Sequence, residues 1–388
     1  MNLSISPKQG SAITVPLIKA DLPPFDFIEG PLREILTSGR ITNFGKYVSS
    51  FEQRTSEYLK SEVATTSSGT MGLIFALQAL GLERGQKVIL PSFTFMATAQ
   101  AVRYAGGIPV FAEIREDLTL DPSDLEVLLE QHQDVAAVIG VHTYGLPCQV
   151  KQIQHVVDEA SCRRGRRIAL VYDAAHAFGS TFDGRHVGTF GDAEVFSLSV
   201  TKALVSVEGG VVSSRNPDVI HRVQKMRNYG IEENYNAHYP GLNGKMSEFH
   251  ALVGLYNLER LDSYMAARQR NARYYSERIR SATCFRLLPW PEGVVHTFKD
   301  FTVLTPESLQ GRRDEVIALL KEEGVETRAY FYPPVHEQCF FQPFADRPLP
   351  RTEAMSRRVL TLPFYTTITE SEMDYVVDAL TGTEGRLA

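Results

Sequence analysis

The stretch FSLSVTKALVSVEGG, residues 196–210, joins two apolar runs that are typical of buried strands, AEVFSLS and GGVVSS. Between the runs lies a single lysine, Lys202, with Val200 and Leu204 close by in the chain. Burial makes the charged form of a lysine costly and lowers its pKa. Such a lysine is a liability in a core and an advantage for an amine nucleophile. The stretch therefore predicts two strands of one sheet and raises the question of what Lys202 does.

Further strand-like runs alternate with helical patterns on the N-terminal side of this stretch. The runs typical of strands are KVILPSF, IPVFAEI, AAVIGVH and IALVYDAA. The segments with apolar residues at helical spacing are MGLIFALQALGL, MATAQAVRYAG, DPSDLEVLLEQ and VKQIQHVVDEA. Continuously apolar strands that alternate with helices indicate an α/β fold with a mainly parallel sheet, covered by helices on both faces.

The C-terminal part of the chain predicts a smaller α/β unit. After Met246 a long helical pattern runs from HALVGLYNLERL to RYYSERIRS. It is followed by FKDFTVLT (strand), RRDEVIALLKEEG (helix), VETRAYFYPP (strand, then turn) and ESEMDYVVDAL (helix). We therefore expect a large domain over residues 27–260 and a small C-terminal domain over residues 261–388. The N-terminal segment, residues 1–26, is expected to pack with the small domain.

Composition excludes several classes of function. The 388 residues carry a formal net charge of −6, so no overall basic field favours a nucleic acid or an anionic membrane as partner. The start of the chain lacks the pattern of a signal peptide, and no apolar run is long enough to span a bilayer. The four cysteines form no CxxC pair, so we expect neither a disulfide framework nor a zinc site, and no metal. A cytoplasmic protein is the expectation.

A possible phosphate site lies in TTSSGTMGLIFALQAL, residues 65–80. Ser68, Gly69 and Thr70 form a turn that leads directly into an amphipathic helix. Free N–H groups and the dipole at a helix start favour a bound phosphate, and a glycine allows it to approach the backbone closely. A plain helix cap explains the same residues. Taken alone, this motif leaves both interpretations open.

Two further motifs follow predicted strands, at the edge where α/β proteins bind ligands. In PSFTFMATA, Phe93 and Phe95 could stack on a flat ring or simply pack in the core. In VYDAAHAFG, Asp173 follows an apolar strand among alanines, and His176 is close behind it. A buried carboxylate needs a partner, and a protonated pyridine nitrogen would serve. A structural Asp–His pair is the alternative.

These pieces are what pyridoxal 5'-phosphate requires when they occur together. The cofactor needs a phosphate-binding site, an aromatic side chain that stacks on its ring, a carboxylate for its ring nitrogen and a desolvated lysine for its aldehyde. All four are present in one chain, in the order Gly69, Phe95, Asp173, Lys202. The set predicts that Lys202 anchors this cofactor.

With these motifs the sequence resembles the DegT/DnrJ/EryC1/StrS family of sugar aminotransferases over nearly its whole length. The motifs that carry the resemblance are SSGT, PSFTFMATA, IPVFAEI, VHTYGLP, DAAHAFG, GRHVGTFGDAEVFSLSVTK, EGG, GLNGKMSE and RAYFYPPVHEQ. The resemblance implies the fold of the type I, aspartate-aminotransferase-like pyridoxal phosphate enzymes. In that fold a large domain with a mainly parallel sheet is joined to a smaller C-terminal α/β domain.

The resemblance also implies roles for individual residues. Lys202 would be the Schiff-base lysine and the catalytic residue, and Asp173 the partner of the pyridine nitrogen. Phe95 would stack on the ring and His176 would lie near its phenolic oxygen. The residues implied to bind the phosphate are Ser68, Gly69, Thr70 and Ser197, with Asn243 of GLNGKMSE reaching across from the neighbouring subunit. A homodimer with composite active sites follows from that last role.

The reaction implied is transfer of an amino group from L-glutamate or glutamine to a nucleotide-linked keto sugar, through the pyridoxamine form of the cofactor. The closest resemblance is to the branch that aminates carbon 4 of dTDP-4-keto-6-deoxyglucose, and the alternative is carbon 3 of a 3-keto-6-deoxyhexose. Ser199, Val207 and Lys245 depart from the commoner family pattern. An alternative of another class is a regulatory or scaffold protein that retains the fold, against which Lys202 and Asp173 argue.

Four other residues are left outside the predicted site, because structural and functional interpretations explain them equally well. They are His142, Glu208, Arg328 and His336.

Overall fold

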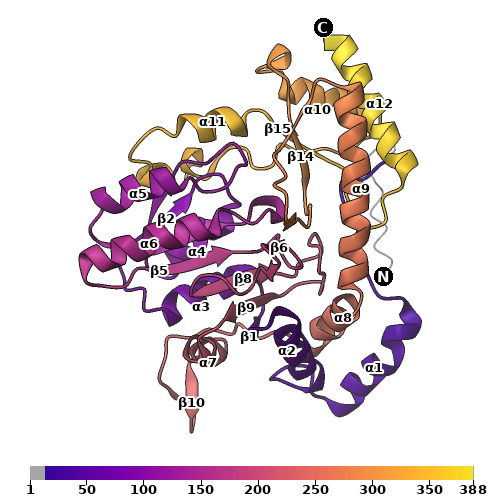
Figure 1. Ribbon diagram of the computed structural model, residues 1–388. Helices are drawn as coiled ribbons and strands as arrows, with labels where there is room; N and C mark the ends of the chain where they lie inside the picture. Colours follow the sequence, from indigo (N-terminus) through magenta and orange to yellow (C-terminus); the bar gives the residue numbers. More distant parts are fainter. Residues whose placement is uncertain (1–13, 388) are drawn as a thin grey trace.

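A seven-stranded sheet in the order β1-β9-β8-β5-β4-β2-β3 forms the centre of the protein (Figure 1). The computed structural model describes residues 14–387. The strands are β1 (Glu62–Thr66), β2 (Lys87–Pro91), β3 (Ile108–Ala112), β4 (Val135–Val141), β5 (Ala169–Asp173), β8 (Ala193–Ser197) and β9 (Gly210–Ser214). Five neighbouring strands, β3, β2, β4, β5 and β8, run parallel to one another. β9 is antiparallel to both of its neighbours, β8 and β1. The predicted mainly parallel sheet is confirmed.

Helices cover both faces of this sheet, which explains why its strands are continuously apolar. One face packs against α3 (Gly69–Ala79), α4 (Met96–Tyr104) and α7 (Pro217–Met226). The other packs against α5 (Pro122–Gln131) and α6 (Val150–Arg164), and, over β1, β9 and β8, against α2 (Lys46–Leu59) and α8 (Glu248–Leu258). The predicted helices α3 to α6 all form. The sequence patterns reveal neither β1 nor the first two helices, α1 (Phe25–Ser38) and α2.

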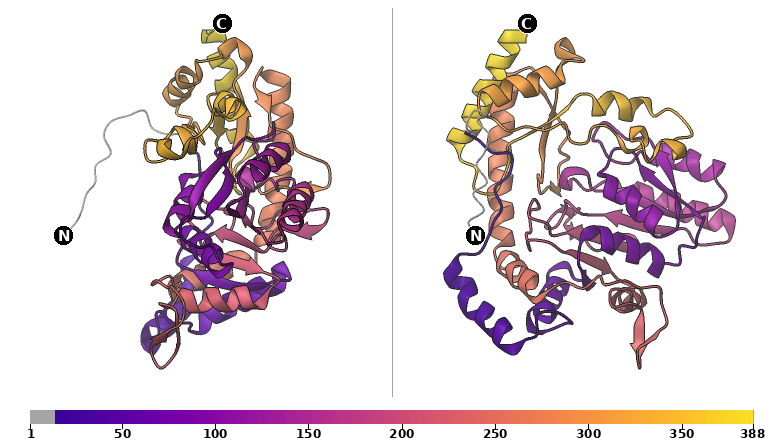
Figure 2. Two further views of the ribbon diagram at one scale, coloured as in Figure 1. Left: turned by 90° about the vertical axis from the view of Figure 1, so that its left-hand side faces the viewer. Right: turned by 180° about the vertical axis from the view of Figure 1, so that it is seen from behind.

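Beyond α8 the chain enters its C-terminal part through α9 (Leu261–Ala282), a long helix at one side of the molecule (Figures 1 and 2). The helical pattern after Met246 thus forms two helices, which meet at Glu259 and Arg260. α9 packs on α12 (Glu370–Leu387) and, with α10 (Arg313–Glu322), on a three-stranded antiparallel sheet. The strands of that sheet are β12 (Arg286–Leu287), β14 (Phe301–Leu304) and β15 (Val359–Leu362).

The prediction of a strand in VETRAYFYPP is wrong. Only Arg328 pairs with a strand, as an isolated bridge to Thr361 of β15. Pro333 and Pro334 have no N–H to donate to a sheet. Instead the segment leaves the small sheet, and Phe331 packs into an aromatic cluster with Phe93 near the end of β2.

Short elements complete the fold. They are β6 (Thr181–Phe182), β7 (Arg185–His186), β10 (Ile231–Glu233), β11 (Asn236–Ala237), β13 (Val294–Val295), α11 (Pro350–Ser356), η1 (Thr143–Gly145), η2 (Glu307–Leu309), η3 (Val335–Glu337) and η4 (Gln342–Phe344). Within the described residues, no helix is both long enough and apolar enough to cross a membrane.

The start of the described chain runs along the C-terminal part. Val15 bridges Val325, the N–H of Leu17 donates to Glu326, and Lys19 forms an ion pair of 2.9 Å with Glu372 of α12. Residues 1–13 of the predicted N-terminal segment lie outside the described residues. The domain boundaries at residues 26 and 260 stay a prediction.

Candidate active site

A cavity of about 200 Å³ lies at the carboxyl ends of the parallel strands, where α/β sheets place their ligands. Eight of the nine residues predicted to form the site line it. They come from the cap and first turn of α3, from the segment after β2, from the end of β5 and the turn after it, and from the end of β8 and the turn after it. These residues are Ser68, Gly69, Thr70, Phe95, Asp173, His176, Ser197 and Lys202. The topology of the sheet brings together side chains that are up to 134 positions apart in sequence (68 to 202).

The start of α3 forms one wall of the cavity. Ser68 caps the helix, and its Oγ accepts the N–H of Met71 at 3.2 Å. Gly69 and Thr70 are the first residues of the helix, so their N–H groups have no acceptor within it. A Cβ atom at Gly69 would lie 2.9 Å from the Cβ of Ser197, so a side chain at this position would collide with β8. This wall therefore offers free N–H groups, and the missing side chain at Gly69 lets a phosphate come close to them.

Lys202 lies in the turn after β8, held by a hydrogen bond of 3.0 Å from its N–H to the carbonyl of Ser199. Its side chain is half-buried and lines the cavity, and its amine has no hydrogen bond or ion pair with any described residue. Burial, and after it the positive charge of Lys299, lowers the pKa of Lys202 to about 7, although the carboxylates of Asp300 and Asp173 act in the opposite direction. Near neutral pH much of this amine is uncharged, as a nucleophile requires.

The depressed pKa of Lys202 predicts a pH-dependent stability for the cofactor-free protein. The pKa is about 7 in the folded chain against 10.5 in a free lysine, so between these values the unfolded chain binds more protons. The destabilising effect of Lys202 is then complete below pH 7 and fades as the pH rises toward 10.5. We expect Lys202→Met to unfold at a higher temperature than the wild type at pH 6.5, with a gap that narrows by pH 9.5. Thermal unfolding of both proteins over this range measures it, and a gap that is constant with pH would contradict the assignment.

Asp173 ends β5 and is only 6% exposed. Its Oδ2 accepts the hydroxyl of Thr98 at 2.7 Å, and its Oδ1 accepts the N–H of Ala175 at 3.0 Å. Burial raises the pKa of this carboxyl, while the two hydrogen bonds and the charge of Lys202 oppose the rise. A cationic ring nitrogen in the cavity would favour the ionised form further, which is the partner that the sequence predicts.

Aromatic rings form the other walls. Phe95 follows β2 and is 42% exposed, so one part of its ring is uncovered in this chain. Phe331 comes from the C-terminal part and lies nearly parallel to the ring of His176, with 6.0 Å between centroids and 14° between planes. Burial holds the pKa of His176 well below its usual value, so its imidazole is neutral at pH 7. The cavity can therefore hold a flat ring beside neutral, largely apolar surfaces.

Several lining or supporting residues lie outside the sequence prediction. His142 lines the cavity and is fully buried: its Nδ1 accepts the N–H of Cys148 at 3.1 Å, and its Nε2 lies 3.0 Å from Glu194. Thr98 lies in the first turn of α4, directly after the cap residue Phe95, and supports the site through its hydrogen bond to Asp173. Phe331 has no local signal in the sequence, because only the chain's path back from the small sheet brings it to the cavity.

Asn243 is the one predicted site residue that does not line the cavity of its own chain. It is exposed and pairs with Asn228 in an isolated antiparallel bridge. Its predicted role across a subunit boundary stays a prediction.

The residues of this cavity fit pyridoxal 5'-phosphate. The free N–H groups of α3 face a wall of β8, the Lys202 amine lacks a partner, and the Asp173 carboxylate is buried. When bound, the cofactor supplies an aldehyde carbon and a ring that accepts electrons from a bond to be broken. In this geometry Lys202 would hold that aldehyde and afterwards carry a proton, and Asp173 would keep the ring nitrogen protonated. The arrangement can exchange amino groups.

Comparison with known proteins agrees with this geometry. The model of the DegT/DnrJ/EryC1/StrS aminotransferase family matches residues 26–381. A GDP-perosamine synthase of Caulobacter vibrioides is 31% identical over 355 residues, covering 89% of this chain and 92% of that protein. A dTDP-4-amino-4,6-dideoxy-D-glucose transaminase of Escherichia coli is 28% identical, covering 95% and 98%. The crystal structure of DesI in the presence of its TDP-sugar product is 34% identical, with a TM-score of 0.87 and coverage of 97% and 96%.

These matches span almost the whole chain and confirm the predicted fold, the predicted cofactor and the predicted class of enzyme. The protein thus belongs to the DegT/DnrJ/EryC1/StrS aminotransferase family, the pyridoxal-phosphate-dependent aminotransferases of nucleotide-sugar pathways.

Proposed function

We propose that the protein transfers an amino group from L-glutamate, or glutamine, to carbon 4 of dTDP-4-keto-6-deoxyglucose. The observation that carries an amino transfer is the unpartnered Lys202 amine in one cavity with the buried Asp173 carboxylate and the free start of α3. The choice of sugar is supported by the relatives named for a dTDP-4-amino sugar and a TDP-sugar product.

Each residue has a task in this proposal. Gly69, Thr70 and Ser197 bind the cofactor phosphate and so fix the position of the ring, and Phe95 covers one face of it. Lys202 takes a proton from the Cα of the amino donor and returns it at the carbon that received the amino group. Asp173 keeps a positive charge on the ring nitrogen, which stabilises the negative charge that develops during this proton transfer. The keto sugar then passes through the same proton movements in reverse order.

The working unit in this proposal is a homodimer with composite active sites. Around the cavity the single chain exposes apolar side chains, a surface that a second copy would cover. The exposed side chains from this region of the chain are Phe95, Met96, Val200, Val207, Tyr229 and Leu242. Asn243 lies next to Leu242 and would reach the cofactor phosphate of the partner subunit.

Composite sites predict complementation between two inactive variants. Lys202→Ala and Asn243→Ala should each be nearly inactive alone. After they are mixed, unfolded and refolded together, half of the dimers are mixed, and each holds one site with both residues intact. We expect about one quarter of wild-type activity to return. No recovery in dimers that are shown to have exchanged subunits would contradict the role of Asn243.

The sugar assignment is tested by loading the enzyme with amino groups from glutamate and then supplying keto sugars. We expect dTDP-4-keto-6-deoxyglucose to restore the original absorbance, and mass spectrometry to find the amino group on carbon 4. A second candidate is the corresponding GDP-linked 4-keto sugar, which the similarity to a GDP-perosamine synthase favours. Faster recovery with the GDP sugar, or with a 3-keto sugar, would overturn the assignment.

A further inference from the structure

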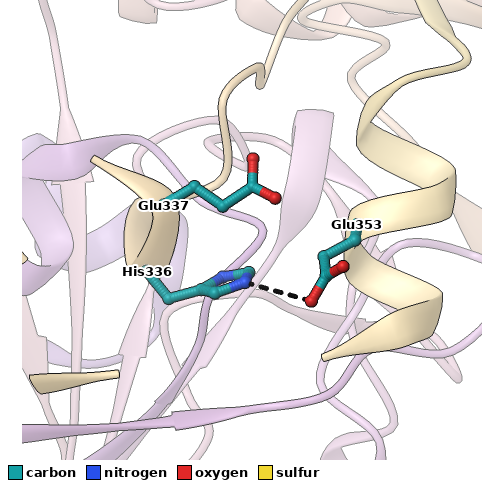
Figure 3. A group of neighbouring side chains, drawn as sticks. All are labelled: His336, Glu337 and Glu353. Atoms are coloured by element: carbon teal, nitrogen blue, oxygen red, sulfur yellow. Dashed lines mark ion pairs between the residues drawn. The ribbon is translucent and has the colours of Figure 1, made fainter. Parts of the chain in front are cut away.

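A second cluster of chemically active side chains lies away from the cofactor cavity, where η3 meets α11. One ring nitrogen of His336 and one carboxylate oxygen each from Glu337 and Glu353 all lie within 4.8 Å of one another. Figure 3 shows the His336 ring directed at Glu353, with the Glu337 side chain beside them. We propose that these three residues bind a divalent metal ion, and that Zn²⁺ suits them best. Imidazole nitrogen and carboxylate oxygen are both ligands that zinc accepts, and three protein ligands leave the fourth position of the ion open.

The first observation is the state of His336 itself. Its side chain is 6% exposed, and its Nε2 has no hydrogen-bond partner among residues 14–387. Glu353 Oε1 lies 3.6 Å from it, which is too long for a hydrogen bond. Two ligands of a tetrahedral zinc ion, each about 2.0–2.2 Å from the metal, are separated by about 3.3–3.6 Å. The spacing therefore suits two atoms that share a metal better than two atoms that bond directly.

The second observation is the way in which the ring is held. His336 Nδ1 lies 2.6 Å from the Oγ of Ser92, and that Oγ also accepts the backbone N–H of His336 at 3.0 Å. A metal-binding histidine characteristically uses its other ring nitrogen in this way, which fixes the ring orientation. The contact with Ser92 leaves Nε2 as the nitrogen that faces Glu353.

Charge and access also favour a cation. Glu337 forms an ion pair of 3.2 Å with Arg357, and Glu353 Oε1 accepts the N–H of Leu349 at 3.0 Å. Two carboxylates against one arginine leave an excess negative charge beside His336. The glutamate side chains are 28% and 26% exposed, so a hydrated ion can reach them from solvent.

An ion at this site would join η3 to α11, next to the contact between η3 and the end of β2. The N–H of Val335 donates to the carbonyl of Ser92 at 3.0 Å, next to the two hydrogen-bonding contacts of His336, and Ser92 begins the segment that carries Phe95. Phe331, four residues before Val335, lines the cofactor cavity. The inference departs from the expectation of no metal, which rested on the cysteine pattern. The proposed ligands include no cysteine, and Glu353 is 16 positions from Glu337, so the sequence shows no compact metal motif.

The test is a Zn²⁺ titration of the cofactor-loaded enzyme by calorimetry, after treatment with a chelator and dialysis. We expect the wild type to saturate one additional site per chain relative to Glu353→Gln, whose amide still accepts the Leu349 N–H, and the variant to bind Zn²⁺ about 100-fold more weakly there. His336→Gln is a second variant with the same expected loss. Glu126→Gln, an exposed change on α5, is the matched control and should bind as the wild type does.

Any zinc that the cofactor itself binds is common to all four proteins, so the difference between them isolates the proposed site. Bleaching of the cofactor absorbance by glutamate verifies that each variant is folded and loaded. The proposal is overturned if the wild type shows no such additional site, or if Glu353→Gln and His336→Gln, both folded, bind Zn²⁺ as tightly as the wild type.

Discussion

Lys202→Ala is expected to abolish nearly all amino transfer, with a fall in kcat of about 10⁴-fold. The change removes both the amine that holds the cofactor aldehyde and the group that moves the proton, and no other lysine lines the cavity among the described residues. Steady-state rates of 2-oxoglutarate release from glutamate measure the effect. The visible absorbance of the loaded protein should change as well, because the covalent attachment is lost.

The matched control is Lys151→Ala, which removes an exposed lysine that forms a surface ion pair with Asp183. We expect it to retain wild-type rates. If Lys202→Ala kept more than a few per cent of the activity, the role assigned to this lysine would be wrong, and Lys299, buried nearby against Asp300, would be the next amine to test.

Asp173→Asn is expected to lower kcat by about 10³-fold while leaving the fold intact. Asparagine has nearly the same shape: its oxygen can still accept the N–H of Ala175, and its NH2 group can donate to the hydroxyl oxygen of Thr98. It carries no negative charge, so the ring nitrogen of the bound cofactor would lose its proton and the ring would accept electrons poorly. The predicted signature is normal cofactor binding with a slow glutamate half-reaction, followed by stopped-flow absorbance.

Asp183→Asn on the surface is the control for this change and should have no effect on either step. A loss of cofactor binding in Asp173→Asn with an unchanged rate per bound cofactor would show that Asp173 serves affinity and not the chemistry of the ring.

The sheet was predictable because its strands are buried on both faces. β5 is buried at all five positions, and a run such as ALVYD has few other stable environments. The sequence did not predict β1 because only two of its five residues, a valine and an alanine, are apolar, whereas the predicted strands are mostly apolar. The strand expected in VETRAYFYPP failed for a different reason. Val325 packs in the core of the small sheet, but only Arg328 pairs with that sheet. Phe331 packs with Phe93 beyond the end of β2.

The cavity was predictable in outline because strand ends mark where ligand-binding side chains must lie. Asp173 and Ser197 are the last residues of their strands, and Phe95 follows β2 closely, so their positions follow from the strand assignments. Phe331 and the group of His336, Glu337 and Glu353 depend on how the C-terminal part folds back on the sheet. No local pattern encodes that path, because it results from contacts between distant segments.

The central claim is that this cavity takes an amino group from an amino acid and gives it to a keto sugar. The most direct measurement is the visible absorbance of the cofactor-loaded protein before and after L-glutamate is added, followed by dTDP-4-keto-6-deoxyglucose. The account predicts that the yellow band bleaches with glutamate and returns with the sugar, once per cycle. A band that forms but responds to neither compound would contradict it.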